Sequence, residues 1–166
     1  MTGPVGDLFR EYHGSLVRML TRRTGDADRA EEIAQEVFAR AVAAPPRNPR
    51  PWLFAVALNL VREEGRREVR QHRRLVLYRA EQPVAFESPD DEMDRNDRQA
   101  AVRAALATLS ERDRDALLLK AEGFSYDDIA ATLGLARGAV GTTLSRARAK
   151  LIDAYRAVEG SHDIAS

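Results

Sequence analysis

Residues 124–151 read FSYDDIAATLGLARGAVGTTLSRARAKL, and this stretch has the pattern of a helix-turn-helix. Gly134 supplies the tight turn, Ala130 is small enough for two helices to cross, and Val140 is the branched apolar residue that faces the first helix. This spacing lets the second helix project from the rest of the domain, so that it can enter a DNA major groove. A short helix pair with a glycine turn also occurs in proteins that never bind DNA, so the geometry leaves both interpretations open.

The charge around this stretch favours DNA. Residues 129–156 carry five basic side chains against a single acidic one, Asp153, for a net charge of +4. A basic last helix is the footprint expected for contacts to DNA phosphates. The alternative is that these charges only solvate an exposed helix face.

Hydrophobic periodicity predicts three helices in the first half of the chain. Apolar residues recur at spacings of three and four over residues 8–20 and 30–41, and Asp26 is the expected N-cap of the second helix. The proline-rich loop at residues 45–51 stops that helix. A third helix then runs to about Arg79 and becomes polar and Arg-rich toward its end.

Four more helical segments follow toward the C-terminus. Ser110 and Ser125, each followed three residues later by an aspartate, fit the pattern of helix N-caps. The last helix is expected from about Arg137 to Val158. No strand candidate appears, so the predicted fold class is all-α, with two small helical domains of which the C-terminal one contains the helix-turn-helix.

An acidic segment separates the two predicted domains. Residues 81–98 hold seven acidic and two basic residues with two prolines and little periodicity. A structureless stretch of this length is uncommon inside one compact domain. It is therefore interpreted as a linker, helical from about Asp91 onward, between a domain at residues 1–80 and one at residues 99–166.

Composition excludes several classes of protein. The 166 residues contain no cysteine, which excludes a disulfide framework, a Cys nucleophile and Cys-containing metal sites. The three histidines are scattered, no Ser/His/Asp or carboxylate pairing stands out, and no phosphate-cradling glycine loop appears. We therefore expect no enzyme activity, no cofactor and no metal. Apolar runs are far shorter than the roughly 20 residues that span a bilayer, and no secretory signal is visible, so a cytoplasmic location is expected.

Taken as a single sum, the formal net charge of zero argues against a nucleic-acid-binding protein. However, the cancellation is between segments: residues 1–80 carry +5, residues 81–98 carry −5, residues 99–128 carry −2, residues 129–156 carry +4 and residues 157–166 carry −2. In the first domain, arginines lie near Trp52 and Phe54, a mixture that suits single-stranded nucleic acid. At the start of an apolar helix, however, both aromatic residues are more often part of the core than platforms on which bases stack.

The order of these motifs resembles one family. The stretch DADRAEEIAQEVFARAV at residues 26–42 resembles the core-polymerase-binding helix of bacterial sigma-70-family factors, and NPRPWLFAVALNLVREEGRR at 48–67 resembles their promoter-melting helix. Residues 106–135 and 138–151 resemble the two parts of the family's fourth region. The small size, with only the second and fourth regions, is similar to the extracytoplasmic-function (ECF) group of these RNA polymerase sigma factors.

The resemblance implies roles for individual residues. The helix face that binds a coiled coil in the polymerase's largest subunit corresponds to Glu32, Gln35 and Glu36, whereas Phe38 is expected in the core. The residues that capture the unpaired −10 element correspond to Arg47, Asn48, Arg50, Asn59, Arg62, Arg66 and Arg67. The recognition helix for the −35 element corresponds to Arg137, Gly138, Ala139, Thr142, Thr143 and Arg146, with Ser145 and Arg148 on phosphates.

The resemblance also implies partners: core RNA polymerase through its coiled coil and flap, promoter DNA, and an anti-sigma factor, with no membrane insertion of the chain itself. The chain departs from the family pattern at Leu58, Ala136 and Gly141, so promoter preferences cannot be copied from relatives. The alternative function is an autonomous helix-turn-helix regulator. It leaves the acidic face of residues 32–36 without a role and predicts tight DNA binding by the free protein.

Overall fold

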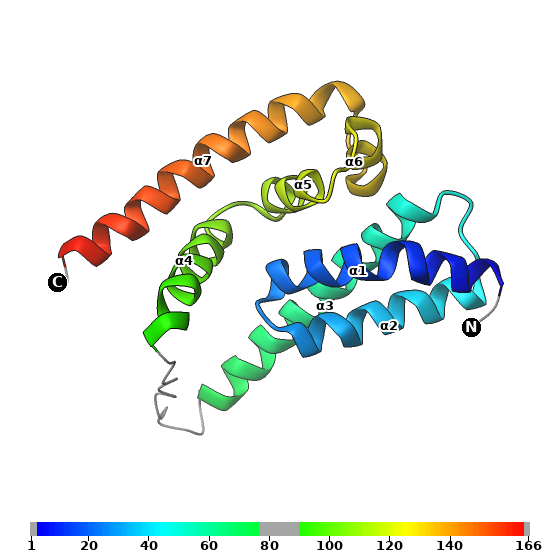
Figure 1. The fold of residues 1–166 in the computed structure, drawn as a ribbon, viewed down its shortest axis with the longest axis horizontal. Helices are drawn as coiled ribbons and strands as arrows, with labels where there is room; N and C mark the ends of the chain where they lie inside the picture. The colour runs from blue at the N-terminus through cyan, green and yellow to red at the C-terminus, as the bar shows by residue number, and fades with distance from the viewer. Residues whose placement is uncertain (1–2, 77–89, 165–166) are drawn as a thin grey trace.

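The computed structural model describes residues 3–76 and 90–164, and these residues form seven α-helices (Figure 1). The helices are α1 (Pro4–Thr24), α2 (Ala27–Ala43), α3 (Pro49–Val76), α4 (Asp90–Ala107), α5 (Glu111–Ala121), α6 (Tyr126–Leu133) and α7 (Arg137–Ile164). The prediction of an all-α chain is confirmed. Below, α1–α3 are called the N-terminal half and α4–α7 the C-terminal half.

The predicted helix starts are confirmed by their capping hydrogen bonds. The Asp26 carboxylate accepts hydrogen bonds from the backbone N–H groups of Asp28 and Arg29 at 3.0 and 3.2 Å. The Ser110 and Ser125 hydroxyls each accept one from the N–H three residues ahead, at 3.2 and 3.1 Å. These bonds satisfy donors that the first helical turn leaves without partners, which is why short polar residues mark the boundaries.

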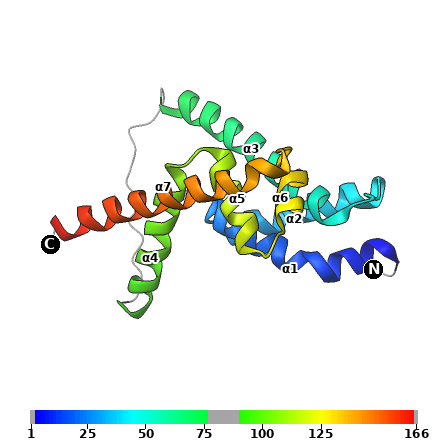
Figure 2. The same ribbon diagram turned by 90° about the horizontal axis from the view of Figure 1, so that it is seen from above.

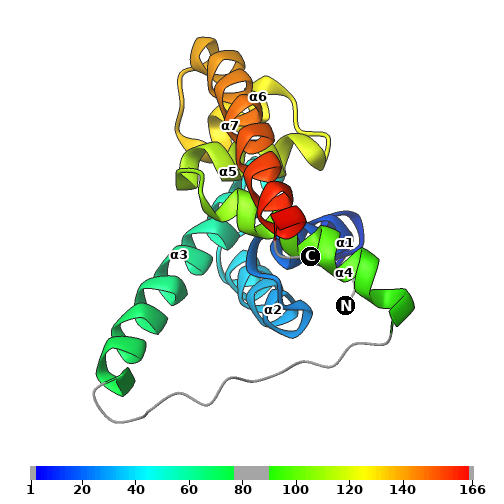
Figure 3. The same ribbon diagram turned by 90° about the vertical axis from the view of Figure 1, so that its left-hand side faces the viewer.

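The N-terminal half is a three-helix bundle whose apolar stripes meet inside. Leu16, Val37 and Leu53 come from α1, α2 and α3 respectively, and each is fully buried. On the surface, Arg29 forms ion pairs with Glu64 at 2.8 Å and Glu68 at 2.7 Å and so ties α2 to α3. Beyond these contacts the C-terminal part of α3 projects away from the other helices (Figure 3).

The C-terminal half contains the predicted helix-turn-helix as α6 and α7. Gly134 ends α6 in the left-handed conformation, with a φ of 67°, and its N–H donates to the Ala130 carbonyl. Val140 is fully buried between the two helices. Helix α7 is longer than predicted, because it continues past Val158 to Ile164 and packs along α4 as well as α5.

The region predicted as a linker is partly helical. Helix α4 begins at Asp90, one residue before the expected Asp91, so residues 90–98 continue directly into the C-terminal half. Residues 81–89 and Arg79 lie outside the described residues. The Nη1 of Arg103 on α4 donates to the Gly25 carbonyl at 3.2 Å, which brings this helix against the end of α1.

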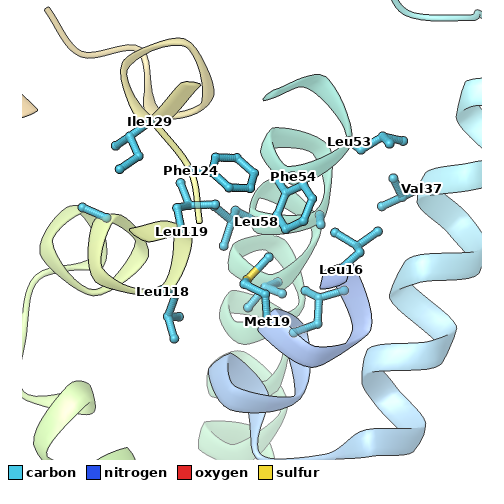
Figure 4. Close-up of a cluster of buried hydrophobic side chains, with 14 of the residues drawn as sticks. Leu16, Met19, Val37, Leu53, Phe54, Leu58, Leu118, Leu119, Phe124 and Ile129 are labelled. Atoms are coloured by element: carbon cyan, nitrogen blue, oxygen red, sulfur yellow. The ribbon is translucent and has the colours of Figure 1, made fainter. Parts of the chain in front are cut away.

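The two halves pack against each other and share one apolar core. Phe54 of α3 meets Phe124, which lies between α5 and α6, edge to face with ring centroids 4.7 Å apart (Figure 4). Leu58 and Leu119 lie beside this aromatic pair and are also buried. Seen from above, α5 and α6 lie over the N-terminal half, and α7 extends away from it (Figure 2).

Candidate nucleic-acid and partner interfaces

Helix α2 presents an exposed polar face on the outside of the N-terminal half. Glu32, Gln35 and Glu36 are all exposed and occupy neighbouring positions along one side of the helix. Glu36 pairs with Arg40 at 3.1 Å on the same face. The opposite side of α2 is buried, and Phe38, at 3% exposure, belongs to it, as the sequence predicted.

The loop between α2 and α3 is basic and open to solvent. Arg47 and Asn48 are exposed there, whereas the aromatic residues that follow turn inward. Phe54 is fully buried and Trp52 is partly buried against the core. Of the two interpretations that the sequence left open, a place in the core therefore holds for Phe54. An unpaired base could therefore stack only on Trp52 or on the side chain of an arginine in this region.

Arg50, predicted to contact the −10 strand, is engaged by the C-terminal half. Its guanidinium carbon lies 4.3 Å from the centre of the Phe124 ring, a cation–π contact. Its Nη2 donates to the Glu122 carbonyl at 3.1 Å, and its Nη1 lies 3.7 Å from a carboxylate oxygen of Asp128. Arg50 is therefore only partly accessible in this arrangement.

Arg62 is held in a similar way further along α3. Its Nη2 donates to Asp115 of α5 at 2.5 Å, and its Nε lies 3.3 Å from Glu111. The remaining residues predicted to bind the −10 strand on α3, Asn59, Arg66 and Arg67, are exposed. The residues predicted to bind the single-stranded −10 element are thus of two kinds. Most are exposed to solvent, whereas Arg50 and Arg62 contact residues of the C-terminal half.

Asp115 is the centre of the electrostatic contacts between the halves. Its side chain is fully buried and accepts a second hydrogen bond from the Arg23 Nε of α1 at 3.3 Å. Burial raises the pKa of the Asp115 carboxyl above its ordinary value, although Arg23 and Arg62 lower it. A carboxylate in such a place depends on its two arginine partners to compensate for lost hydration.

The first turns of α7 form an exposed basic surface beyond the helix-turn-helix core. Of the residues predicted to contact the −35 element or its phosphates, seven are exposed: Arg137, Gly138, Ala139, Thr142, Ser145, Arg146 and Arg148. Thr143 differs from them. Only 5% of it is exposed, and its hydroxyl donates to the Ala139 carbonyl at 2.8 Å. At the start of α7, Arg137 forms an ion pair with Asp127 of α6.

Sequence reasoning did not identify the residues that join the two halves. Arg23, Asp115, Glu122 and Phe124 all contribute to this contact, yet none belonged to the candidate sites. The sequence carries one faint signal for them. Asp115, like Asp113, is a buried residue of α5 and places a charge where a hydrophobic residue would pack.

Within residues 3–76 and 90–164, no cluster of three or more potential metal ligands occurs. No helix in this part of the chain is long and apolar enough to cross a membrane. An open pocket of about 690 Å³ lies beside Arg23 and Arg62, lined by α1–α3 and, from the C-terminal half, by Glu111.

The chain matches two protein-family models. Residues 8–74 match the family described as "Sigma-70 region 2", and residues 99–151 match the one described as "Sigma-70, region 4". Together the two matched ranges cover most of the chain.

Curated proteins with similar sequences include two sigma factors. The ECF RNA polymerase sigma factor EcfG of Rhodopseudomonas palustris is 34% identical, and the alignment covers 84% of this chain and 78% of that protein. The ECF RNA polymerase sigma factor SigL of Mycobacterium tuberculosis is also 34% identical, over 82% of this chain and 80% of that protein.

Two solved structures are similar to this chain over about nine tenths of its length. One is the sigma factor RpoE in complex with the anti-sigma factor NepR from Bartonella quintana, with a TM-score of 0.62, 26% identity, and coverage of 90% of this chain and 97% of that one. The other is CnrH in complex with the cytosolic domain of CnrY, with a TM-score of 0.65, 26% identity, and coverage of 92% and 88%.

Proposed function

The chain belongs to the ECF group of sigma-70-family RNA polymerase sigma factors and directs RNA polymerase to promoters, and from this membership we propose which of its surfaces does what. Residues 1–80 act as region 2, residues 99–166 act as region 4, and residues 81–98 connect them. Such a protein acts by positioning polymerase and DNA, with no catalysis of its own.

The exposed polar face of α2 is the polymerase-binding surface in this proposal. Glu32, Gln35 and Glu36 are solvent-accessible on a helix whose other side is locked into the core. A rigid scaffold of this kind presents the three side chains in fixed positions to the coiled coil of the largest polymerase subunit. Contact with the polymerase flap is assigned to the C-terminal half.

The two DNA elements are assigned to the two halves. Region 4 reads the −35 element through the exposed start of α7, because a helix that follows a tight turn can lie in the major groove. Region 2 holds the unpaired −10 strand through the basic loop and the outer face of α3, from Arg47 to Arg67. Guanidinium groups there suit phosphates and splayed bases.

An anti-sigma factor is proposed as a further partner, and the cytoplasm as the location. Of the two similar solved chains, RpoE is in complex with the anti-sigma factor NepR, and CnrH is in complex with the cytosolic domain of CnrY. Membership of a family that works on RNA polymerase supports the cytoplasmic location.

The observation that carries the proposal is the coexistence of both surfaces in one chain: an acidic, exposed face on α2 and a basic, exposed start of α7. An autonomous helix-turn-helix regulator needs only the second. The test is run-off transcription with purified core polymerase and a promoter library. We expect promoter-dependent initiation only when the chain is added, and weak DNA binding by the chain alone. Tight, sequence-specific binding without polymerase would instead support the autonomous regulator.

A further inference from the structure

The recognition helix begins with a single charged side chain. In the first two turns of α7, residues 137–144, Arg137 is followed only by glycine, alanine, valine, threonine and leucine. Arg137 is exposed, and so are its small neighbours Gly138 and Ala139. Such a surface lets a base pair come close to the helix backbone and offers it one guanidinium as the only charged donor.

Arg137 is held by a residue of the neighbouring helix. Its Nε forms an ion pair with Oδ1 of Asp127, which lies in the first turn of α6. Helix α6 packs against the start of α7, drawn in orange in Figure 1. A Cβ added at Gly141 of α7 would lie 3.6 Å from the ring of Tyr126, the first residue of α6. The beginning of α6 therefore lies beside the first turns of the recognition helix.

Stability is a poor explanation for this ion pair. The side chains of Arg137 and Asp127 are 75% and 69% exposed, and exposed ion pairs contribute little to stability. An acidic residue in the first turn of a helix is favourable by itself. However, the next residue, Asp128, provides the same benefit, and it lies near Arg50 of α3, at 3.7 Å. The feature particular to Asp127 is that its partner belongs to the recognition helix.

The ion pair determines which donors of Arg137 are available to DNA. A guanidinium carries one N–H on Nε and two on each Nη nitrogen, in a rigid planar fork. Asp127 engages the Nε, and in the part of the chain that the structure describes the two Nη groups have no ionic partner. Two donors side by side match the O6 and N7 acceptors that guanine presents in the major groove, a pair that no other base offers there.

We propose that Asp127 is a positioning residue for promoter recognition, which holds Arg137 so that its two Nη groups read one guanine of the −35 element. The proposal rests on the assignment of the start of α7 to that element. It adds the base that is read and the residue that prepares the reading. Asp127 acts through Arg137, because a long side chain that is already held loses less conformational entropy when it binds.

Asp127→Asn removes the ion pair with little other change. It takes away the negative charge and keeps the size of the side chain, and because Asp127 is exposed the fold should be unaffected. The matched control is Asp128→Asn, which makes the same chemical change at the next residue, whose ionic partner is Arg50. Both variants remove one negative charge from the same turn, so any general gain in attraction for phosphates is common to them.

The test is run-off transcription with core polymerase on a promoter that the parent chain uses, after its −35 element has been randomised. The bases found in the transcribed templates give the preference at each position. We expect Arg137→Ala to abolish the preference for guanine at one position, a loss of roughly 5- to 150-fold for a bidentate contact. Asp127→Asn should weaken the same preference by roughly 2- to 12-fold, because Arg137 must then be ordered when it binds guanine. Asp128→Asn should leave this preference unchanged.

A second measurement tests the contacted atom. Replacing that guanine by 7-deazaguanine removes the N7 acceptor and keeps the Watson–Crick pairing. The parent should transcribe the modified template several-fold less well, whereas Arg137→Ala should transcribe both templates equally, because it no longer makes the contact. A parent that transcribes both templates equally would overturn the reading of guanine, and so would equal sensitivity in the parent and in Arg137→Ala.

Arg146→Ala separates this proposal from the assignment on which it rests. If Arg146→Ala changes the preference at another position while Arg137→Ala and Asp127→Asn match the parent, α7 reads the −35 element and the role of Asp127 is wrong. If the parent shows no preference anywhere in the randomised element, the assignment of α7 fails and the role of Asp127 fails with it. A uniform gain on all templates in Asp127→Asn, with the guanine preference intact, would also overturn the proposal, since it would show only the removal of a charge that repels phosphates.

Discussion

Phe54 and Phe124 lie edge to face with ring centroids 4.7 Å apart, and both rings are buried although they belong to opposite halves of the chain. Aromatic pairs in this geometry contribute beyond their buried area. Since Phe124 also lies under the guanidinium of Arg50, one side chain joins the apolar core to the charged contacts around it.

Phe124→Ala is expected to destabilise the whole protein by about 3–5 kcal/mol, because it leaves a cavity in the shared core. Urea unfolding followed by circular dichroism measures the change. Val69→Ala is the control, since Val69 is 54% exposed and its truncation should cost less than about 0.5 kcal/mol. Two separate unfolding transitions in the parent, with only one affected, would contradict a shared core.

Arg146→Glu is expected to reduce promoter-dependent transcription roughly 5- to 150-fold, as the loss of a base or phosphate contact worth about 1–3 kcal/mol implies. Run-off transcription gives the effect, and a core-polymerase pull-down should remain unchanged. Arg156→Glu makes the same charge change further along α7, beyond the helix-turn-helix, and should have little effect. Loss of the pull-down in Arg146→Glu would mean misfolding or a wrong assignment.

Glu36→Arg should weaken binding to core polymerase, which Arg146→Glu should leave unchanged. It reverses the charge on the exposed face of α2 and also removes the pair with Arg40, so core polymerase affinity should fall first, by about tenfold or more. Titration of labelled chain with core polymerase measures this affinity. Glu11→Arg on α1 is the matched control. Equal loss in both variants would indicate a nonspecific effect of net charge.

Gly134→Ala should destabilise the C-terminal half by about 1–2 kcal/mol, because an L-residue with a Cβ is disfavoured at a φ of 67°. The cost comes from the backbone alone, since an added Cβ meets no atom within 4 Å. Gly134→Asn should cost less, as asparagine tolerates the left-handed conformation better. Thermal unfolding of the three proteins gives the order, and an alanine variant as stable as the parent would refute it.

Local features of the fold could be predicted from the sequence. Asp26, Ser110 and Ser125 mark helix starts because a capping side chain bonds backbone groups only two or three residues away. Gly134 marks a turn for an equally local reason, the conformation of its own backbone. Such signals lie within one turn of helix, so periodicity and single residues are sufficient to find them.

The contact between the halves could not be predicted in the same way. Asp115 and Arg23 are 92 residues apart, and no pattern along the chain indicates which arginine a buried aspartate will meet. Thr143 illustrates a smaller limit. Its place near the start of α7 suggests a DNA contact, but its side of the helix packs into the protein and only 5% of the residue is exposed. Both results depend on tertiary packing, which local signals do not encode.

Because Arg23 precedes Asp115 by 92 residues, the two partners of this contact are synthesised at different times. During synthesis α1, α2 and α3 leave the ribosome before α5 exists, and domains generally fold as they emerge, N-terminal first. The three-helix bundle has apolar contacts of its own, with Leu16, Val37 and Leu53 at their centre. A nascent chain therefore passes through a stage in which Arg50 and Arg62 are uncovered, and it loses that exposure only once α5 has been translated.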